Sequence, residues 1–162
     1  MIAVMIQIQK VSSDNALAAA RDLIREHLEA NSHAHDAAST AAKLAALPAP
    51  YVPPAGGIWL AWDGAEPAGC VALHALTPEI AEVKRMYVRP ESRRRGIARE
   101  LGERVIAEAR ELGYARLRLG TLTTMLAAQN LYASLGFETI PPYRNAEFGD
   151  TLFYELDLRA SA

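Results

Sequence analysis

The strongest constraint on the fold is a strand, a long helix and a second strand that follow one another with short connections. Glu82–Val88 has a strand pattern that Pro90 ends, and Ala115–Thr121 has another. Between them, apolar residues at spacings of three or four share one helical face up to Gly113, a typical C-terminal stop. Because strands joined by such a helix run parallel with a right-handed crossover, the sequence predicts a βαβ unit in an α/β fold.

Further helices and strands are predicted around this unit. Ser12, Ser13 and Asp14 offer N-cap oxygens to a first helix, Asp36 offers one to a second, alanine-rich helix that Pro48 ends, and Gly136 stops a last helix. The remaining strand patterns are an alternation from Ile2 to Ile8, a hairpin of 58–62 and 69–76 around Asp63-Gly64, and two C-terminal segments, 137–140 and 151–156.

Length and composition fit one soluble domain over residues 1–162, with 51% hydrophobic residues and a net charge of -2. The net charge gives no global cationic field, so nucleic acid and membrane surfaces are not expected partners. Cys70 is the only cysteine, which excludes an internal disulfide and a thiolate metal cluster. No apolar run is long enough to span a bilayer, and we expect a cytoplasmic protein.

The connection between the first strand and the long helix predicts an anion site. Positive charge is concentrated there, because residues 84–118 hold 11 of the 17 basic residues against five acidic ones. Unpaired N–H groups at a helix N-terminus favour phosphate, and Gly96 and Ala98 are small enough for close approach. The glycine pattern of a dinucleotide fold and the lysine of a P-loop are both missing from this connection.

The motifs of this region resemble those of the GCN5-related N-acetyltransferase (GNAT) superfamily. Arg93–Ala98 matches the signature Q/R-x-x-G-x-G/A, and Ala128–Phe137 matches A-x-x-L-Y-x-x-x-G-F. The resemblance implies a GNAT fold: a bent, mixed, mostly antiparallel sheet with about four helices. Its two central parallel strands, Glu82–Val88 and Ala115–Thr121, would splay apart at one end to admit acetyl-CoA.

The resemblance also implies a set of site residues. Backbone N–H groups of Met86, Tyr87 and Val88 would bind the cofactor and the oxyanion of the reacting carbonyl. Tyr132 matches the tyrosine that protonates the departing thiolate, and it lies one position off the expected buried stripe of its helix, Ala128, Leu131 and Leu135. The expected pyrophosphate loop consists of Arg93, Arg94, Arg95, Gly96, Ile97, Ala98 and Arg99.

A general base must take a proton from the attacking ammonium. Some family members carry a glutamate on the second parallel strand, but Gly120 stands at that position here. Glu82 matches the strand glutamate that histone-acetylating relatives use as the base. A solvated edge charge or an ion pair with an arginine are alternatives for Glu82. Met125 also departs from the family, in which many members carry an asparagine near CoA.

Other reactive side chains have simpler explanations. His33, His35 and Asp36 precede a helix without further ligand pairs, so a solvated loop is expected and no metal site. His74 lies on a strand beside the expected cleft and is either a proton relay or, as we favour, a hydrogen-bonded structural histidine. Cys70 has no catalytic partner nearby in sequence and is expected in the core.

The sequence thus predicts an acetyl-CoA-dependent N-acetyltransferase that acts by direct attack of a primary amine in a ternary complex. The expected partner is a small-molecule amine or amino acid, with a homodimer as an open alternative. A noncatalytic acyl-CoA-binding sensor and acetylation of a protein amine are the competing functions. The segments expected to line the acceptor pocket, 32–51 and 141–150, contain no motif that identifies the acceptor.

Overall fold

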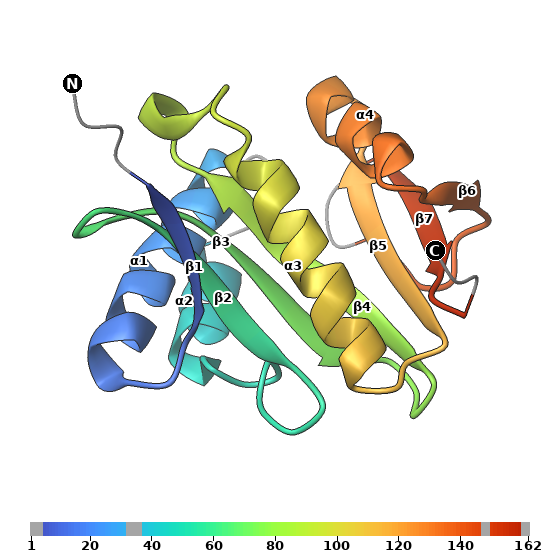
Figure 1. Cartoon of the computed structure of the whole chain (residues 1–162), viewed down its shortest axis with the longest axis horizontal. Helices are drawn as coiled ribbons and strands as arrows, with labels where there is room; N and C mark the ends of the chain where they lie inside the picture. The colour runs from blue at the N-terminus through green and yellow to red at the C-terminus, as the bar shows by residue number, and fades with distance from the viewer. Residues whose placement is uncertain (1–4, 32–36, 147–149, 160–162) are drawn as a thin grey trace.

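The computed structural model describes residues 5–31, 37–146 and 150–159. Helices and strands follow one another along the chain in the predicted order (Figure 1). The elements are β1 (Ile6–Lys10), α1 (Asp14–Ala30), α2 (Ala37–Ala46), β2 (Gly57–Asp63), β3 (Glu66–Ala75), β4 (Ile80–Val88), the short 3₁₀ helix η2 (Pro90–Ser92), α3 (Ile97–Glu111), β5 (Arg116–Leu122), α4 (Leu126–Ser134), β6 (Glu138–Ile140) and β7 (Thr151–Asp157).

Local sequence signals explain where these elements begin and end. The Ser13 hydroxyl accepts a hydrogen bond from the Ala16 N–H at 3.1 Å, which confirms the predicted cap of α1. Gly113 and Gly136 both adopt positive φ directly after helices, a conformation that favours glycine. The predicted cap Asp36 and the first residues of the strand that begins at Ile2 lie outside the described residues.

The seven strands form one mixed sheet in the order β1-β2-β3-β4-β5-β7-β6. All neighbouring pairs are antiparallel except β4 and β5, which run parallel as the βαβ pattern predicts. Pairing of β4 with β5 is limited to Ile80 with Arg116, Ala81 with Leu117 and Glu82 with Arg118. Beyond Glu82 the two strands separate, which confirms the expected splay and makes this residue the last paired one on β4.

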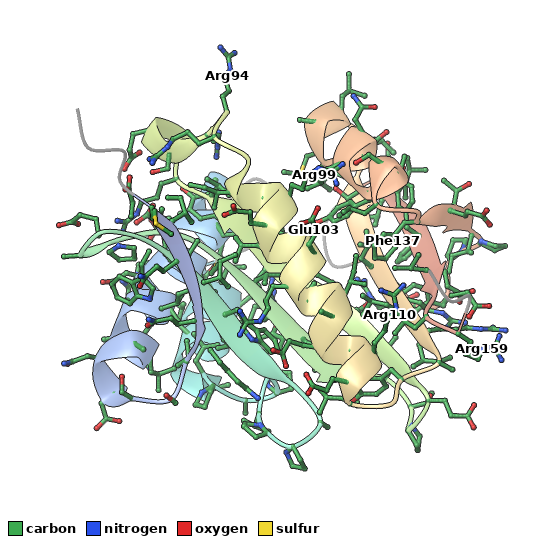
Figure 2. The ribbon with its side chains drawn as sticks, in the orientation of Figure 1. Arg94, Arg99, Glu103, Arg110, Phe137 and Arg159 are labelled. Carbon is green, nitrogen blue, oxygen red and sulfur yellow. The ribbon has the colours of Figure 1, made fainter. Side chains whose placement is uncertain are left out.

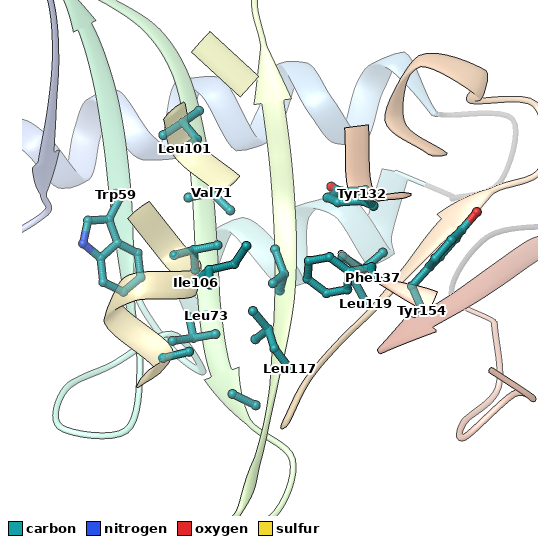
Figure 3. Packing of buried hydrophobic residues seen from close by; sticks show 14 of the residues in the cluster. Trp59, Val71, Leu73, Leu101, Ile106, Leu117, Leu119, Tyr132, Phe137 and Tyr154 are labelled. Atoms are coloured by element: carbon teal, nitrogen blue, oxygen red, sulfur yellow. The ribbon is translucent and has the colours of Figure 1, made fainter. Parts of the chain in front are cut away.

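Side chains from the two faces of the sheet pack into two hydrophobic clusters. On one face, α3 covers Trp59, Val71 and Leu73, and the cluster extends to Tyr132 of α4 (Figure 3). On the other face, Leu23, Ile24 and Leu28 of α1 are fully buried against β2 and β3. Burial of side chains of this size contributes about 1.5–3 kcal/mol each, so both faces of the sheet are firmly covered near its centre.

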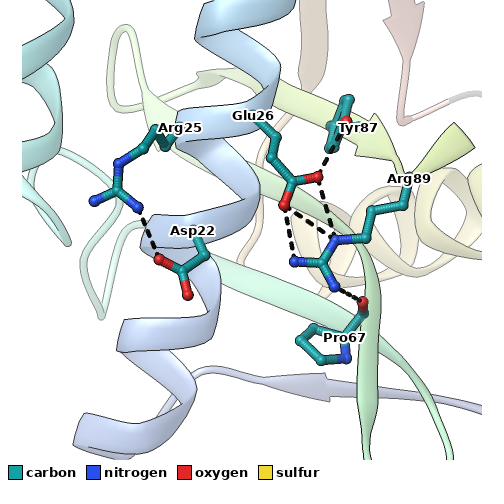
Figure 4. Close-up of polar contacts among 6 residues, drawn as sticks. All are labelled: Asp22, Arg25, Glu26, Pro67, Tyr87 and Arg89. Carbon is teal, nitrogen blue, oxygen red and sulfur yellow. Dashed lines mark hydrogen bonds and ion pairs between the residues drawn. The ribbon is translucent and has the colours of Figure 1, made fainter.

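A polar network fixes α1 against the end of β4 (Figure 4). The Glu26 carboxylate accepts hydrogen bonds from the Arg89 guanidinium at 2.8–3.2 Å and from the Tyr87 hydroxyl at 3.2 Å. Arg89 also donates to the Pro67 carbonyl oxygen at 2.9 Å. Because a charge-assisted fork is geometrically specific, this network sets the position of α1 beside the splayed part of the sheet.

Candidate active site

The separation of β4 from β5 leaves the backbone of β4 open on one edge. Arg85 adopts a positive φ of 60°, and the register with β3 shifts between Cys70 and Ala72, so β4 contains a bulge there. The Arg89 N–H donates to the Ala68 carbonyl of β3 at 2.9 Å. Since N–H direction alternates along a strand, the N–H of Val88 faces the opposite edge, where β5 has moved away.

A pocket lies in the gap between these strands and reaches both faces of the sheet. Its walls on the strands are residues 83–86 of β4 and 119–122 of β5, while α1 contributes His27 and its C-cap Asn31, and α4 contributes Tyr132. Because α1 and α4 cover opposite faces of the sheet, a molecule on one face can reach a molecule on the other through this pocket. We call it the passage.

Tyr132 combines a packed ring with access to the passage. Its side chain is 6% exposed, and its ring contacts Phe137 and Tyr154 at centroid distances of 5.7 and 6.4 Å (Figure 3). The prediction that this residue lies off the buried stripe of α4 is wrong, because Tyr132 is the buried residue of that helix, whereas Leu131 and Leu135 are only half-buried. Burial raises the pKa of the Tyr132 phenol, which therefore keeps its proton at neutral pH.

The loop before α3 has the backbone geometry expected of an anion site. Gly96 is the N-cap of α3, has a positive φ of 77° and provides no side-chain cap to the helix N–H groups. A Cβ at this position would meet nothing within 4 Å, so the helix N-terminus is open. Ile97 is 1% exposed and packs in the core, so only its backbone can contribute to such a site.

The loop arginines have different surroundings. Arg93 donates to the Val88 carbonyl at 2.9 Å and Arg95 forms an ion pair with Asp63, so both hold the loop against the sheet. Arg94 extends into solvent (Figure 2), and Arg99 donates to the Ser134 hydroxyl of α4 at 2.6 Å. Arg94 and Arg99 are therefore the side chains best placed to meet phosphate, and Arg93 and Arg95 shape the loop.

Glu82 lies at the point where the strands part, in a cluster completed by one residue of β3 and two residues of the β6–β7 connection. Its carboxylate faces His74 Nε2 at 2.9 Å, accepts a hydrogen bond from the Tyr143 hydroxyl, and accepts one from Arg144 Nε at 2.7 Å. The residue is only 2% exposed. The alternative in which Glu82 pairs with an arginine is thus what the geometry shows, and Tyr143 and Arg144 belong to the β6–β7 connection.

These contacts determine the charge of Glu82. Burial alone would raise the pKa of its carboxyl, but the hydrogen bonds from His74, Tyr143 and Arg144 outweigh burial and lower the pKa to about 2. The carboxylate is therefore ionised at neutral pH, and His74 must present a protonated Nε2 to it. A group with so low a pKa is a weak base toward an ammonium, which weighs against the predicted role of Glu82 as general base.

Gly120, where some relatives carry a glutamate, makes room for Arg144 instead. A Cβ at Gly120 would lie 3.2 Å from Arg144 Nη2 and 3.0 Å from Thr151 Cγ2. The guanidinium also stacks over Phe153 and Tyr143, at 5.2 and 5.6 Å from the ring centroids. Sequence reasoning did not find Tyr143 or Arg144, because they occupy an irregular connection without a periodic pattern or a family motif.

The remaining candidates are accounted for by packing. Cys70 is fully buried, donates to the Arg85 carbonyl at 3.2 Å and has its thiol pKa raised by burial to about 12, so it is a core residue. Met125 lines the passage and is 40% exposed. His33, His35 and Asp36 lie outside the described residues, and the described part of the chain contains no cluster of three metal-binding side chains.

Comparison with known proteins agrees with this geometry. The acetyltransferase (GNAT) family matches residues 18–137. The chain belongs to this family. The GNAT match includes α1, the splayed strands, the loop before α3 and Tyr132, so each part of the passage described above falls within it.

Individual GNAT relatives are similar in sequence or in fold. An uncharacterised N-acetyltransferase of Schizosaccharomyces pombe is 39% identical over 110 residues, which cover 67% of this chain and 68% of the relative. The N-acetylaspartate synthetase of Danio rerio is 36% identical over 60% of this chain and 35% of its own length. The structure of YncA from Salmonella typhimurium, solved with acetyl-CoA, has a TM-score of 0.76 at 20% identity and covers 97% of this chain and 96% of that one.

Three of the first four curated relatives are matched over less than two thirds of their own length. Among the helices that the structure describes, none has the length and apolar character needed to cross a membrane.

Proposed function

We propose that the chain is a single acetyltransferase domain that moves an acetyl group from acetyl-CoA to the primary amine of a small molecule or amino acid. The observation that carries the proposal is the passage, which joins the face of the sheet covered by α1 to Tyr132 on the other face. A thioester and an amine can then meet from opposite sides. Support for an amino acid as acceptor comes from the relative named N-acetylaspartate synthetase.

The residues around the passage fit acetyl-CoA, which supplies the acyl group as a thioester. The open N-terminus of α3 at Gly96, with Arg94 and Arg99 beside it, suits the pyrophosphate. The N–H of Val88 points into the gap between the strands and can donate to the carbonyl oxygen as negative charge develops there. YncA, solved with acetyl-CoA, has the same fold, which supports this placement.

Two proton transfers complete the reaction. Tyr132, protonated because burial raises its pKa, donates to the departing CoA thiolate. Glu82 stays ionised and bonded to Arg144 and His74, so it is a poor acceptor for a further proton. The attacking amine therefore gives its proton to water in the passage. The whole transfer takes place in one ternary complex without an acetylated protein intermediate.

The test is a panel of primary amines incubated with purified protein and acetyl-CoA, with release of free CoA and formation of N-acetyl product measured together. The panel contains amino acids, diamines and a short peptide with a free N-terminus. We expect equimolar CoA and N-acetyl product with at least one small amine. If acetyl-CoA raises the melting temperature but no amine releases CoA, the chain is an acyl-CoA-binding module instead. Acetylation of the peptide alone would favour a protein acceptor.

A further inference from the structure

We propose that Arg144 binds the carboxylate of the acceptor and that the acceptor is an α-amino acid. The inference rests on the proposed function and adds the residue that selects the substrate. It starts from the position of Arg144 in the connection between β6 and β7, on the face of the sheet opposite α4. Its guanidinium lies against Gly120, which lines the passage.

The guanidinium of Arg144 is held firmly at one edge and open at the other. Nε donates to Glu82 at 2.7 Å and Nη1 donates to the Asn145 carbonyl at 2.9 Å. The rings of Tyr143 and Phe153 fix its plane. Nη2 makes no hydrogen bond with any residue that the structure describes, and the side chain is 24% exposed. The Nη1–Nη2 edge therefore retains donors in the fork geometry that a carboxylate accepts.

Glu82 explains why this arginine is oriented rather than mobile. Three donors hold its carboxylate: His74 of β3, and Tyr143 and Arg144 of the β6–β7 connection. His74 and Tyr143 satisfy the remaining lone pairs of Glu82, so the pair stays ionised and leaves one guanidinium edge for a ligand. Glu82 is thus a positioning residue for Arg144.

The lining of the passage does not oppose an anionic group. No carboxylate side chain lines it among residues 5–31, 37–146 and 150–159. Gly120 contributes space, because a side chain at this position would crowd Arg144 Nη2. Where the resemblance places a glutamate base in some relatives, this chain has Gly120, and the Arg144 guanidinium occupies the space beside it.

Arg144 lies close to the passage. Its Nη2 is 3.2 Å from the position of a Cβ at Gly120, which lines the passage, so a carboxylate bound by this guanidinium would lie beside the passage. An α-amino acid meets this requirement, whereas a polyamine or a long-chain amine has no group for Arg144. The group that Arg144 recognises is therefore a carboxylate on the acceptor, and the α-amino acids are the class that carries it next to the amine.

The experiment compares L-amino acids with their α-amides, which keep the amine and the side chain but lose the carboxylate. We expect Arg144→Gln to lower kcat/KM for the acids about 100-fold, mainly through KM, and to change kcat/KM for the amides less than threefold. Arg144→Lys should restore part of the activity toward acids. Because each variant is compared with wild type on the same substrate, differences in amine basicity cancel. Arg116→Gln, which removes a half-exposed arginine from β5, is the matched control. It should change kcat/KM neither for the acids nor for the amides.

Several results would overturn the proposal. An equal loss toward acids and amides would make Arg144 a purely structural residue, and no loss at all would remove it from the site. A wild-type preference for amines that lack a carboxylate would also contradict the proposal, but it would leave acetyl transfer to amines intact.

Binding tests the proposal independently of transfer. Calorimetry of L-amino acids with the CoA-bound protein should show binding that Arg144→Gln abolishes and Arg116→Gln preserves. If no amine is acetylated but this Arg144-dependent binding remains, the proposed function fails and the carboxylate site stands. If neither acids nor amides bind the CoA-bound protein, the carboxylate site is refuted.

Discussion

Arg144 Nε lies 2.7 Å from Glu82 Oε2, an ion pair between residues 62 positions apart in the chain. It joins the last residue of β4 that pairs with β5 to the connection between β6 and β7. The two strands therefore part at the point where the Arg144 guanidinium meets the sheet. This relationship links the shape of the sheet to the proposed carboxylate site.

The pH dependence of activity distinguishes a positioning glutamate from a base. Because the pKa of Glu82 is about 2, its charge is constant from pH 6 to 9, and Glu82→Gln should lower kcat/KM by the same factor throughout. Misplacement of Arg144 makes a loss on the order of 10–100-fold reasonable. The measurement is a kcat/KM profile of both proteins with one accepted amino acid. A loss that shrinks as pH rises, when more acceptor arrives as free amine, would instead identify Glu82 as the general base.

The same low pKa predicts how Glu82 contributes to stability. A carboxyl whose pKa is lower in the folded than in the unfolded chain stabilises the fold above the unfolded pKa of about 4.3, and this contribution disappears as pH falls toward 2. At pH 7, Glu82→Gln should reduce the free energy of unfolding by roughly 3 kcal/mol. In urea titrations the difference from wild type should stay constant between pH 8 and 5 and narrow below pH 4. A difference that does not change down to pH 3 would show that the charge of Glu82 is not involved.

Removal of one hydroxyl tests the proton donor. Tyr132→Phe keeps the ring between Phe137 and Tyr154 but cannot protonate the thiolate, so kcat should fall on the order of 100-fold while acetyl-CoA affinity stays nearly unchanged. Tyr154→Phe removes a hydroxyl from the same aromatic cluster and is the matched control, with kcat expected within about twofold of wild type. Equal effects of the two substitutions on kcat would show that the Tyr132 hydroxyl is not the proton donor and that the residue serves only in packing.

Charge at the start of α3 tests the cofactor site. Gly96 has a positive φ that asparagine and aspartate both tolerate, so Gly96→Asn and Gly96→Asp impose similar backbone strain and differ in charge. Acetyl-CoA at a hundredfold excess over Kd should stabilise the wild type by about 2.7 kcal/mol. Acetyl-CoA should raise the melting temperature of Gly96→Asn nearly as much as that of the wild type. It should not raise the melting temperature of Gly96→Asp. Retention of the full shift by Gly96→Asp would place the phosphates elsewhere.

The fold was predictable because its signals are local and periodic. The predicted helix that ends at Gly113 connects two apolar strands, and such a connection requires the strands to run parallel. β4 and β5 are that parallel pair. The loop before α3 was predictable in the same way, since its glycine and arginines lie within six residues. The error at Tyr132 arose because α4 packs through its aromatic ring rather than through the aliphatic residues that a periodic stripe favours.

The cluster around Glu82 was not predictable, because its residues come from segments that are distant in the chain. Glu82, His74 and Arg144 meet only after β3, β4 and the β6–β7 connection have been placed. The pKa of Glu82 depends on these contacts, so a sequence motif could indicate a carboxylate but not its basicity. Gly120 likewise signalled the loss of a base, whereas its structural effect is to admit a guanidinium.

The most direct test of direct transfer through the passage is the pattern of initial rates when acetyl-CoA and an accepted amino acid are both varied. If the thioester and the amine meet from opposite faces of the sheet, double-reciprocal plots should intersect, and acetyl-CoA alone should leave the protein mass unchanged. Cys70, the only thiol, is buried and has its pKa raised to about 12, so it cannot carry the acetyl group. Parallel lines together with an acetylated protein would contradict transfer in a ternary complex.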